Sequence, residues 1–203
     1  MKIFCIGRNY PDHAKELGNA IPTNPIFFMK PETALITNNK PFFLPDFSTE
    51  IHHEIEIVLK INKVGKNIAP NFAHRYYDEL TIGLDFTARD LQQQCKEKGL
   101  PWEIAKSFDG SAPIGTFISK ESITEFKNID FQLTINQQVR QQGNSVDMLF
   151  YFDDLISYVS QFVTLKKGDL LFTGTPAGVG KVDKGDILEG FLNNEKLLHC
   201  KVL

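Results

Sequence analysis

Several features that mark common protein classes are scarce in this chain. Its 22 Lys and Arg against 25 Asp and Glu give a formal net charge of −3, whereas proteins that neutralise nucleic-acid phosphates normally carry a basic excess. The three cysteines, Cys5, Cys95 and Cys200, lie far apart without a C-x-x-C pair, so neither a disulfide framework nor a zinc ribbon is indicated. No apolar run approaches membrane-spanning length, and the first one is too short for a signal peptide. We expect a cytoplasmic protein without nucleic-acid or membrane partners.

The length and composition indicate one globular unit. A chain of 203 residues buries about 70% of its surface on folding, which is ample for one core and too little for two. Hydrophobic residues make up 42% of the chain and charged residues 23%, so apolar surface is sufficient to offset chain entropy. We therefore expect a single domain that spans residues 1–203.

Phenylalanine is abundant, with 17 residues, and much of it lies in short apolar runs bounded by Pro, Asn or Gly. Such runs are typical of strands. Helical spacing is scarcer, and because strands outnumber helices without alternating regularly with them, we expect a β-rich or α+β fold. The expected strands are 1–6, 26–29, 41–45, 54–62, 81–86, 131–135, 169–173 and 197–203, and the expected helices are 10–17, 72–80, 88–99 and 153–164.

Two carboxylates stand two residues apart in an apolar run, at Glu54 and Glu56. In a strand they share one face, because side chains alternate between faces. On a solvated face such a pair needs no explanation, but on a buried face two like charges require a cation between them. Oxygen ligands suit Mg²⁺, Mn²⁺ or Ca²⁺ better than zinc. The pair indicates either a solvated surface or a metal site.

A third carboxylate is available near the end of another apolar run. Asp85 falls where that run turns polar, a place where loops assemble functional sites. It is equally suited to capping a helix, and Asp90 competes with it from a helical stretch. Arg89 is expected to pair with a carboxylate in or near the site.

A lysine in apolar surroundings, Lys106, follows the lone Trp102. If it is partly buried, it could hold a substrate anion or stabilise an enolate. The alternative is a surface lysine whose stem lies along apolar neighbours.

The stretch 173–181 contains three glycines but fits no phosphate-loop pattern, because Val179 and Val182 break the G-x-x-x-x-G-K-[ST] spacing. Its backbone N–H groups and Thr175 could still bind a carboxylate. A tight structural turn is the alternative.

His13 and Glu16 stand three residues apart in a helical stretch. On one helix face they can hydrogen-bond, and a carboxylate that orients an imidazole allows it to activate water. An exposed surface pair is the alternative.

Taken together and in order, these segments resemble the fumarylacetoacetate hydrolase family, especially its small acylpyruvate hydrolase and oxaloacetate-handling members. The resemblance covers nearly the whole chain. The matching segments are Gly7-Arg8-Asn9-Tyr10 with His13 and Glu16, Phe28-Met29-Lys30-Pro31, His52-His53-Glu54-Ile55-Glu56, Asp85-Phe86-Thr87-Ala88-Arg89-Asp90, Lys106-Ser107-Phe108-Asp109, Met148-Leu149-Phe150 and Thr173-Gly174-Thr175-Pro176-Ala177-Gly178-Val179-Gly180.

The resemblance implies a compact, mostly β fold around a mixed sheet in the form of a roll or barrel, with a lid segment at about residues 8–20. It also implies Mg²⁺ or Mn²⁺ as cofactor and a homodimer. The residues that match the family's functional positions are Glu54, Glu56 and Asp85 as metal ligands, Lys106, His13 and Glu16 as catalytic residues, and Arg8, Arg89, Gln92 and Thr175 as substrate-binding residues.

The implied function is metal-dependent chemistry on a small 2-oxo acid, with hydrolysis of a carbon–carbon bond in acylpyruvates as the first expectation. Oxaloacetate decarboxylation or tautomerisation and 2-hydroxyhepta-2,4-diene-1,7-dioate isomerisation are alternatives, since each needs the same stabilised enolate. A non-catalytic binding module on the same fold is a rival from another class, and a nucleotide-binding enzyme is a more distant one.

Overall fold

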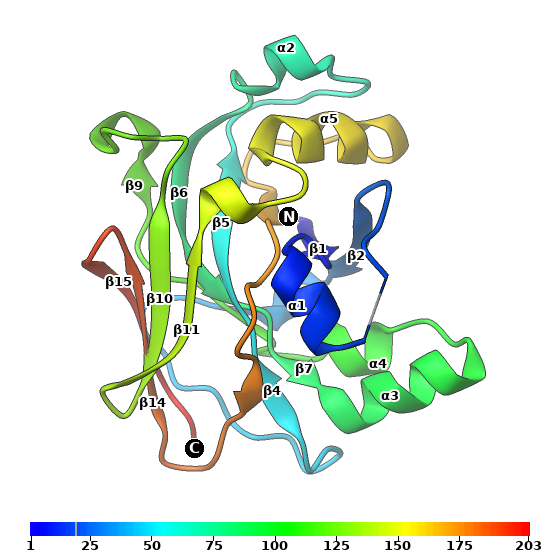
Figure 1. Cartoon of the computed structure of the whole chain (residues 1–203), viewed down its shortest axis with the longest axis vertical. Helices are drawn as coiled ribbons and strands as arrows, with labels where there is room; N and C mark the ends of the chain where they lie inside the picture. The colour runs from blue at the N-terminus through cyan, green and yellow to red at the C-terminus, as the bar shows by residue number, and fades with distance from the viewer. Residues whose placement is uncertain (19) are drawn as a thin grey trace.

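A mixed six-stranded sheet forms the centre of the computed structural model, which describes residues 1–18 and 20–203 (Figure 1). Its strand order is β2-β1-β12-β5-β6-β9. Neighbours β1 and β12 run parallel, and all other neighbours in this sheet run antiparallel. The strands are β1 (Ile3–Gly7), β2 (Ile26–Lys30), β5 (Ile55–Ile61), β6 (Tyr77–Leu84), β9 (Ile118–Ser119) and β12 (Leu170–Phe172).

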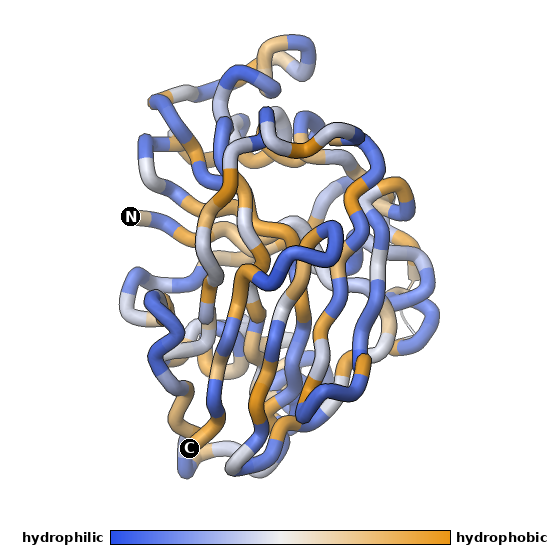
Figure 2. Tube along the Cα trace, turned by 90° about the vertical axis from the view of Figure 1, so that its left-hand side faces the viewer, coloured by the Kyte–Doolittle hydropathy of each residue, from blue (hydrophilic) through white to orange (hydrophobic). Residues whose placement is uncertain are grey.

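A four-stranded antiparallel sheet, ordered β11-β10-β14-β15, packs against the first and encloses the main core with it. The approach is close at Gly190, where an added Cβ would come within 2.6 Å of the Ile82 side chain on β6. Apolar and polar residues alternate along these strands, as expected for a sheet with one buried face (Figure 2). The strands are β10 (Asp130–Ile135), β11 (Gln138–Asn144), β14 (Ile187–Leu192) and β15 (Glu195–Lys201).

Smaller elements surround the lower end of β5 and β6 in Figure 1. A three-stranded sheet has the order β13-β4-β7, and a two-stranded sheet pairs β3 with β8. Helices α3 and α4 lie at this end, whereas α2 and α5 pack together at the opposite end (Figure 1). The strands are β3 (Leu35–Ile36), β4 (Ile51–His53), β7 (Thr87–Ala88), β8 (Ala112–Pro113) and β13 (Gly180–Lys181). The helices are α1 (Pro11–Glu16), α2 (Pro70–Ala73), α3 (Arg89–Lys98), α4 (Glu103–Lys106) and α5 (Phe152–Phe162), with 3₁₀ turns at Glu32–Ala34, Lys120–Ser122 and Ser145–Asp147.

Local sequence explains where the helices near this end begin and end. Helix α1 begins with Pro11, whose missing N–H costs nothing in the first turn. Helix α3 ends at Gly99, which adopts the left-handed conformation (φ 63°) that closes many helices. The bounds of both helices therefore lie within one or two residues of the predicted bounds.

The mostly β, α+β class is confirmed, and so are most of the predicted elements. The sheets of the described residues stay open rather than closing into a barrel. Two predictions are wrong. The helix expected over 72–80 is wrong beyond Ala73, where α2 ends, because Tyr77 to Leu80 pair with β5 as part of β6. In 41–45 only Phe42 forms a β-bridge, to Val202. Asn19, which the predicted lid segment 8–20 includes, lies outside the described residues.

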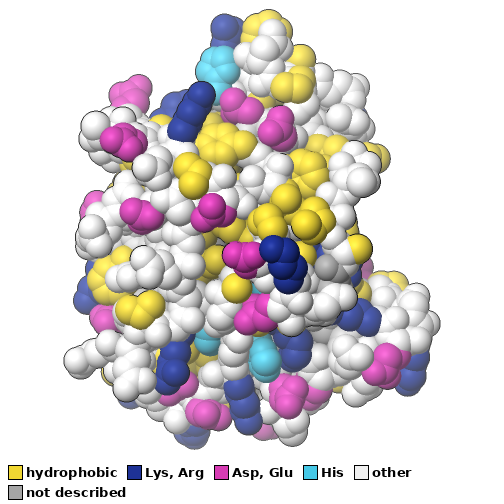
Figure 3. All heavy atoms as spheres, viewed as in Figure 1, with side chains coloured by type: hydrophobic (Ala, Val, Ile, Leu, Met, Phe, Trp, Pro, Cys, Tyr) yellow, Lys and Arg dark blue, Asp and Glu magenta, His cyan; other side chains and the backbone are white. Residues whose placement is uncertain are grey.

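The surface carries charges of both signs. In the space-filling view, acidic and basic side chains are interspersed, and neither sign dominates this face (Figure 3). No helix in the described ranges 1–18 and 20–203 has the length and apolar character needed to cross a membrane.

Candidate metal centre and active-site pocket

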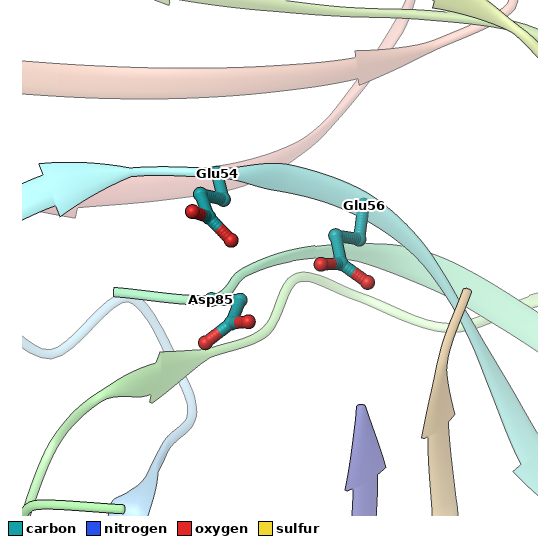
Figure 4. Close-up of side chains that lie close together, drawn as sticks. All are labelled: Glu54, Glu56 and Asp85. Atoms are coloured by element: carbon teal, nitrogen blue, oxygen red, sulfur yellow. The ribbon is translucent and has the colours of Figure 1, made fainter. Parts of the chain in front are cut away.

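Three buried carboxylates meet where β5 begins and β6 ends. Glu56 lies on β5, Glu54 directly precedes that strand, and Asp85 directly follows β6. The antiparallel register pairs Glu56 with Gly83, and the Asp85 N–H donates to the Glu54 carbonyl at 2.8 Å. One oxygen from each carboxylate lies within 4.8 Å of the others, and the three side chains point toward one another (Figure 4).

Three cations pair with two of these carboxylates, Glu54 and Asp85. The Lys106 ammonium, on α4, lies 2.7 Å from both Glu54 Oε2 and Asp85 Oδ2. Lys30 Nζ, on β2, lies 2.8 Å from Asp85 Oδ1, and Arg89 pairs with the other oxygen of Glu54. Buried charges are tolerated when they are paired in this way, because each partner replaces lost hydration.

The neighbours of each group determine its pKa. Burial would raise the pKa of Glu54, but the charges of Lys106 and Arg89 outweigh it and hold that pKa well below its usual value. For Lys106, burial would lower the pKa, and Asp85 and Glu54 raise it instead. Glu56 has no such partner, so burial and then repulsion from Asp85 raise its pKa well above the usual value, although the Gly174 N–H partly offsets this.

The donor set fits a hard divalent cation. All three candidate ligands offer carboxylate oxygens, the ligands that Mg²⁺ and Mn²⁺ prefer. Lys30 directs its N–H bonds at the carbonyls of Phe86 and Ser111, so Asp85 Oδ1 is buried without a well-directed hydrogen bond. Glu56, which has no cationic side chain within ion-pair distance among the described residues, offers a second oxygen that a cation would satisfy.

A small pocket connects this cluster with the other predicted residues. Its cavity volume is about 30 Å³. The unpredicted residues Ile6, Gly7, Leu17, Phe28, Lys96 and Trp102 also line it. The predicted residues along its wall are Arg8, His13, Glu54, Glu56, Asp85, Arg89, Gln92, Lys106 and Thr175.

Glu16 is the predicted site residue that does not line the pocket. Its carboxylate lies 3.3 Å from His13 Nδ1 and accepts hydrogen bonds from the Gly178 N–H at 3.1 and 3.2 Å. His13 itself is buried. Because Nδ1 faces Glu16, Nε2 is the ring nitrogen that is available to the pocket. The pair is therefore a buried imidazole oriented by a carboxylate, and not an exposed surface pair.

The loop after β12 approaches the cluster through its backbone. The Gly174 N–H donates to Glu56 Oε2 at 2.6 Å. Gly174 adopts φ +103°, and an added Cβ would lie 2.6 Å from the Cβ of Asn9, so only glycine is accommodated there. The buried Asn9 side chain binds the Thr173 carbonyl and both backbone groups of Phe150. This part of the glycine-rich stretch thus positions the site.

Two buried residues that hold the site together were missed by the sequence analysis. Gln141, on β11, accepts hydrogen bonds from the Ile55 N–H and donates to Thr175 Oγ1 and the Pro176 carbonyl. Nothing in its Gln-rich surroundings distinguishes it. Lys30 ends an apolar run, but lysine is mostly exposed in proteins, so the run alone gave no sign that this lysine is buried.

The chain is similar to known proteins over nearly its whole length. The family described as fumarylacetoacetate (FAA) hydrolase C-terminal matches residues 2–198. The mitochondrial oxaloacetate tautomerase of Mus musculus is 40% identical over 98% of this chain and 90% of its own length. The mitochondrial oxaloacetate decarboxylase of Dictyostelium discoideum is 42% identical over 93% of this chain and 87% of its own.

A solved structure extends the likeness to three dimensions. The fumarylpyruvate hydrolase of Pseudomonas aeruginosa, in complex with Mn²⁺ and pyruvate, superposes with a TM-score of 0.94 at 35% identity, covering 100% of this chain and 89% of that one. Family match, identity and fold agree over nearly the full length. The chain is therefore an enzyme of the fumarylacetoacetate hydrolase family.

Proposed function

We propose that this protein is a Mg²⁺- or Mn²⁺-dependent enzyme that stabilises the enolate of a small 2-oxo acid, with oxaloacetate as its substrate in tautomerisation and decarboxylation. The observation that carries the proposal is the charge balance of the buried cluster. Three carboxylates face three cations there. A divalent cation would leave the cluster with two positive charges, and the carboxylate and enolate oxygens of an ionised 2-oxo acid would neutralise them.

The candidate cation ligands are Glu54, Glu56 and Asp85, and a cation held there would supply Lewis-acid polarisation of the 2-oxo group. The residues around it have separate tasks. Lys106 places a fixed positive charge beside the cluster, which favours an enolate over the neutral ketone. Thr175, held by Gln141, and Gln92 offer polar groups for the substrate carboxylate.

His13 is the proposed proton carrier. Its Nδ1 is engaged by Glu16, so Nε2 can remove a proton from the carbon beside the 2-oxo group and return it to the enol oxygen. The short helix α1 covers the pocket and limits water to the small remaining volume, which protects an enolate from unwanted protonation.

Hydrolysis of acylpyruvates is a second candidate, and the same His13–Glu16 pair favours it. An imidazole held by a carboxylate can deprotonate water, and attack of that water on the distal carbonyl would break the carbon–carbon bond. The enolate left behind is that of pyruvate, which decarboxylation of oxaloacetate would also form. The fumarylpyruvate hydrolase similarity supports this candidate, whereas the tautomerase and decarboxylase similarities support the first.

The test is a thermal melt with Mg²⁺ or Mn²⁺, with and without oxalate as a mimic of a 2-oxo enolate. We expect a cation-dependent rise in Tm that increases when oxalate is added, because both bind only the folded state. Decay of the oxaloacetate enol and cleavage of acetylpyruvate, followed by ultraviolet absorbance, then rank the two reactions. No shift in Tm under any of these conditions would contradict the proposal and favour a non-catalytic binding module.

The single domain over residues 1–203, the homodimer and the cytoplasmic location stay predictions. Gel filtration with light scattering measures the oligomeric state.

A further inference from the structure

One face of α3 forms a wall of the pocket. Arg89, Gln92 and Lys96 all line it, and their spacing of three and four residues places them on one side of a helix. The neighbouring Cys95 is buried and Glu97 is exposed. The wall therefore carries three polar side chains, of which Lys96 has no role in the proposed chemistry.

Arg89 and Gln92 are already engaged by the cluster. The Arg89 guanidinium pairs with Glu54 and also donates to Gln92 Oε1 at 2.6 Å. These two residues therefore connect the α3 wall to the candidate metal ligands. These contacts make them less available to the far end of a bound substrate.

Lys96 differs from them because it is a half-buried cation without a counterion. No carboxylate of the described residues lies within ion-pair distance of its ammonium, whose recorded neighbour is the Trp102 ring, with the centroid at 6.0 Å. Burial, followed by the positive charges of Arg89 and Arg8, lowers the pKa of Lys96. Holding this cation next to others costs free energy, and a bound anion would recover it.

Arg8 contributes a second cation to the same pocket. It too lacks an ion-pair or hydrogen-bond partner for its side chain among the residues the structure describes. Its backbone adopts φ +59°, a conformation that is uncommon for residues other than glycine. Such conformations persist where the surroundings fix them, here beside the anchored Asn9, and they concentrate at functional sites.

We propose that Lys96 and Arg8 form an outer anion subsite that binds the second carboxylate of a 2-oxo dicarboxylic acid while its 2-oxo end lies at the acidic cluster. This inference rests on the proposed function and specifies its substrate class. With a divalent cation bound, the positive charge of the acidic cluster matches the 2-oxo end of such a substrate only. Lys96 and Arg8 match the carboxylate at its other end. Leu17, Phe28 and Trp102 supply apolar wall around them, which excludes water and strengthens the pairing.

The test compares two ligands of equal length that differ at the far end. Both 2-oxoglutarate, which ends in a carboxylate, and 2-oxopentanoate, which ends in a methyl group, are titrated calorimetrically into the Mn²⁺-loaded protein. We expect 2-oxoglutarate to bind more tightly. Lys96→Met should weaken it about tenfold, as expected for loss of one partly desolvated ion pair, and change 2-oxopentanoate binding less than twofold.

Three further variants separate recognition from packing. Lys96→Arg keeps the charge and should retain most of the preference for 2-oxoglutarate over 2-oxopentanoate. Arg8→Gln should lose that preference, as Lys96→Met does. Lys98→Met, on an exposed position of the same helix outside the pocket, should change neither affinity. The Tm of each variant checks folding.

The outcomes distinguish the two proposals. If the Mn²⁺-loaded protein binds oxalate but shows no preference for 2-oxoglutarate, or if Lys96→Met weakens both ligands equally, the outer subsite is wrong and the proposed function stands. If neither oxalate nor any 2-oxo acid binds with Mn²⁺ present, both proposals fall.

Discussion

The floor and the cover of the pocket are built in opposite ways. The floor is defined as Glu54, Glu56, Asp85, Lys30 and Lys106. It consists of buried groups on strands, directly beside strands and on α4, each with at least one close polar partner. The cover, defined as α1 with His13 and Glu16, has six helical residues. Among the described residues, the side chains of α1 form hydrogen bonds with the rest of the molecule through Glu16, which accepts from the Gly178 N–H.

This contrast separates two requirements of a site for unstable intermediates. The floor must fix charges in space, and close-packed paired groups do so at the cost of mobility. In the proposed reaction the cover would admit ligand and then exclude water, and short helices with few anchors belong to the elements of lowest local stability. We therefore expect floor substitutions to abolish ligand binding and cover substitutions to affect proton transfer.

The largest effect should come from the floor, at Glu56→Gln. Loss of one candidate ligand charge should weaken Mn²⁺ binding and lower turnover by roughly three orders of magnitude, since Lewis-acid stabilisation contributes several kcal/mol. The Tm without metal should not fall, because Gln removes a buried carboxylate whose pKa is raised and still accepts the Gly174 hydrogen bond. Mn²⁺ calorimetry and a metal-free melt measure both, and a change in Mn²⁺ affinity below threefold would falsify the ligand assignment.

A smaller and more selective effect should follow from His13→Gln in the cover. General acid–base catalysis contributes about 100-fold or more, so acetylpyruvate cleavage should fall by that factor while Mn²⁺- and oxalate-dependent stabilisation persists. Oxaloacetate decarboxylation should fall less, because it needs the electron sink of the floor more than a proton carrier. Equal losses in the two reactions would remove the proton-carrying role from His13.

The smallest effect tests whether α3 is anchored like the floor or like the cover. Burial would raise the pKa of Asp90, but hydrogen bonds from Ser48, Thr49 and Leu91 lower it. A carboxylate whose pKa is lower in the folded state stabilises the fold above its unfolded pKa near 4, and that contribution disappears as pH falls through the folded value. Asp90→Asn should therefore cost roughly 0.5–1 kcal/mol at pH 7.

Urea unfolding at pH 7 and at pH 3.5 measures the contribution of the Asp90 carboxylate to the free energy of unfolding. The stability gap between the unaltered protein and Asp90→Asn should narrow at the lower pH. A gap of constant size would show that Asp90 acts through its shape and not its charge.

Local pattern singled out the three floor carboxylates as candidates because their spacing is local, but it left a solvated surface open and gave Lys30 no role. The alternation that places Glu54 and Glu56 on one face, and the change from apolar to polar residues at Asp85, are both visible in the sequence. The resemblance to a family supplied the pairing between these segments, which spacing alone leaves open. Where tertiary pairing overrides local preference, as at Tyr77 to Leu80, prediction failed.

Residues that act across sheets carried no local signal. Gln141 serves the site from β11, a strand of the second sheet, and its neighbours in sequence are similar exposed amides. Lys96 resembles a solvated helix lysine until the fold turns its face of α3 toward Arg8 and Trp102. Such roles depend on three-dimensional juxtaposition, which periodicity does not encode.

The parallel pairing of β1 with β12 has a consequence for the order of folding. Ile3 aligns with Leu170 and Cys5 with Phe172, so strands from opposite ends of the chain lie side by side, and Asn9 from one end then binds the Thr173 carbonyl from the other. Contacts so distant in sequence form late and slow folding, because loop-closure entropy must be overcome first. During synthesis, the floor carboxylates leave the ribosome long before Gly174 and Thr175, so the pocket closes only after the segment that carries these two residues has been made.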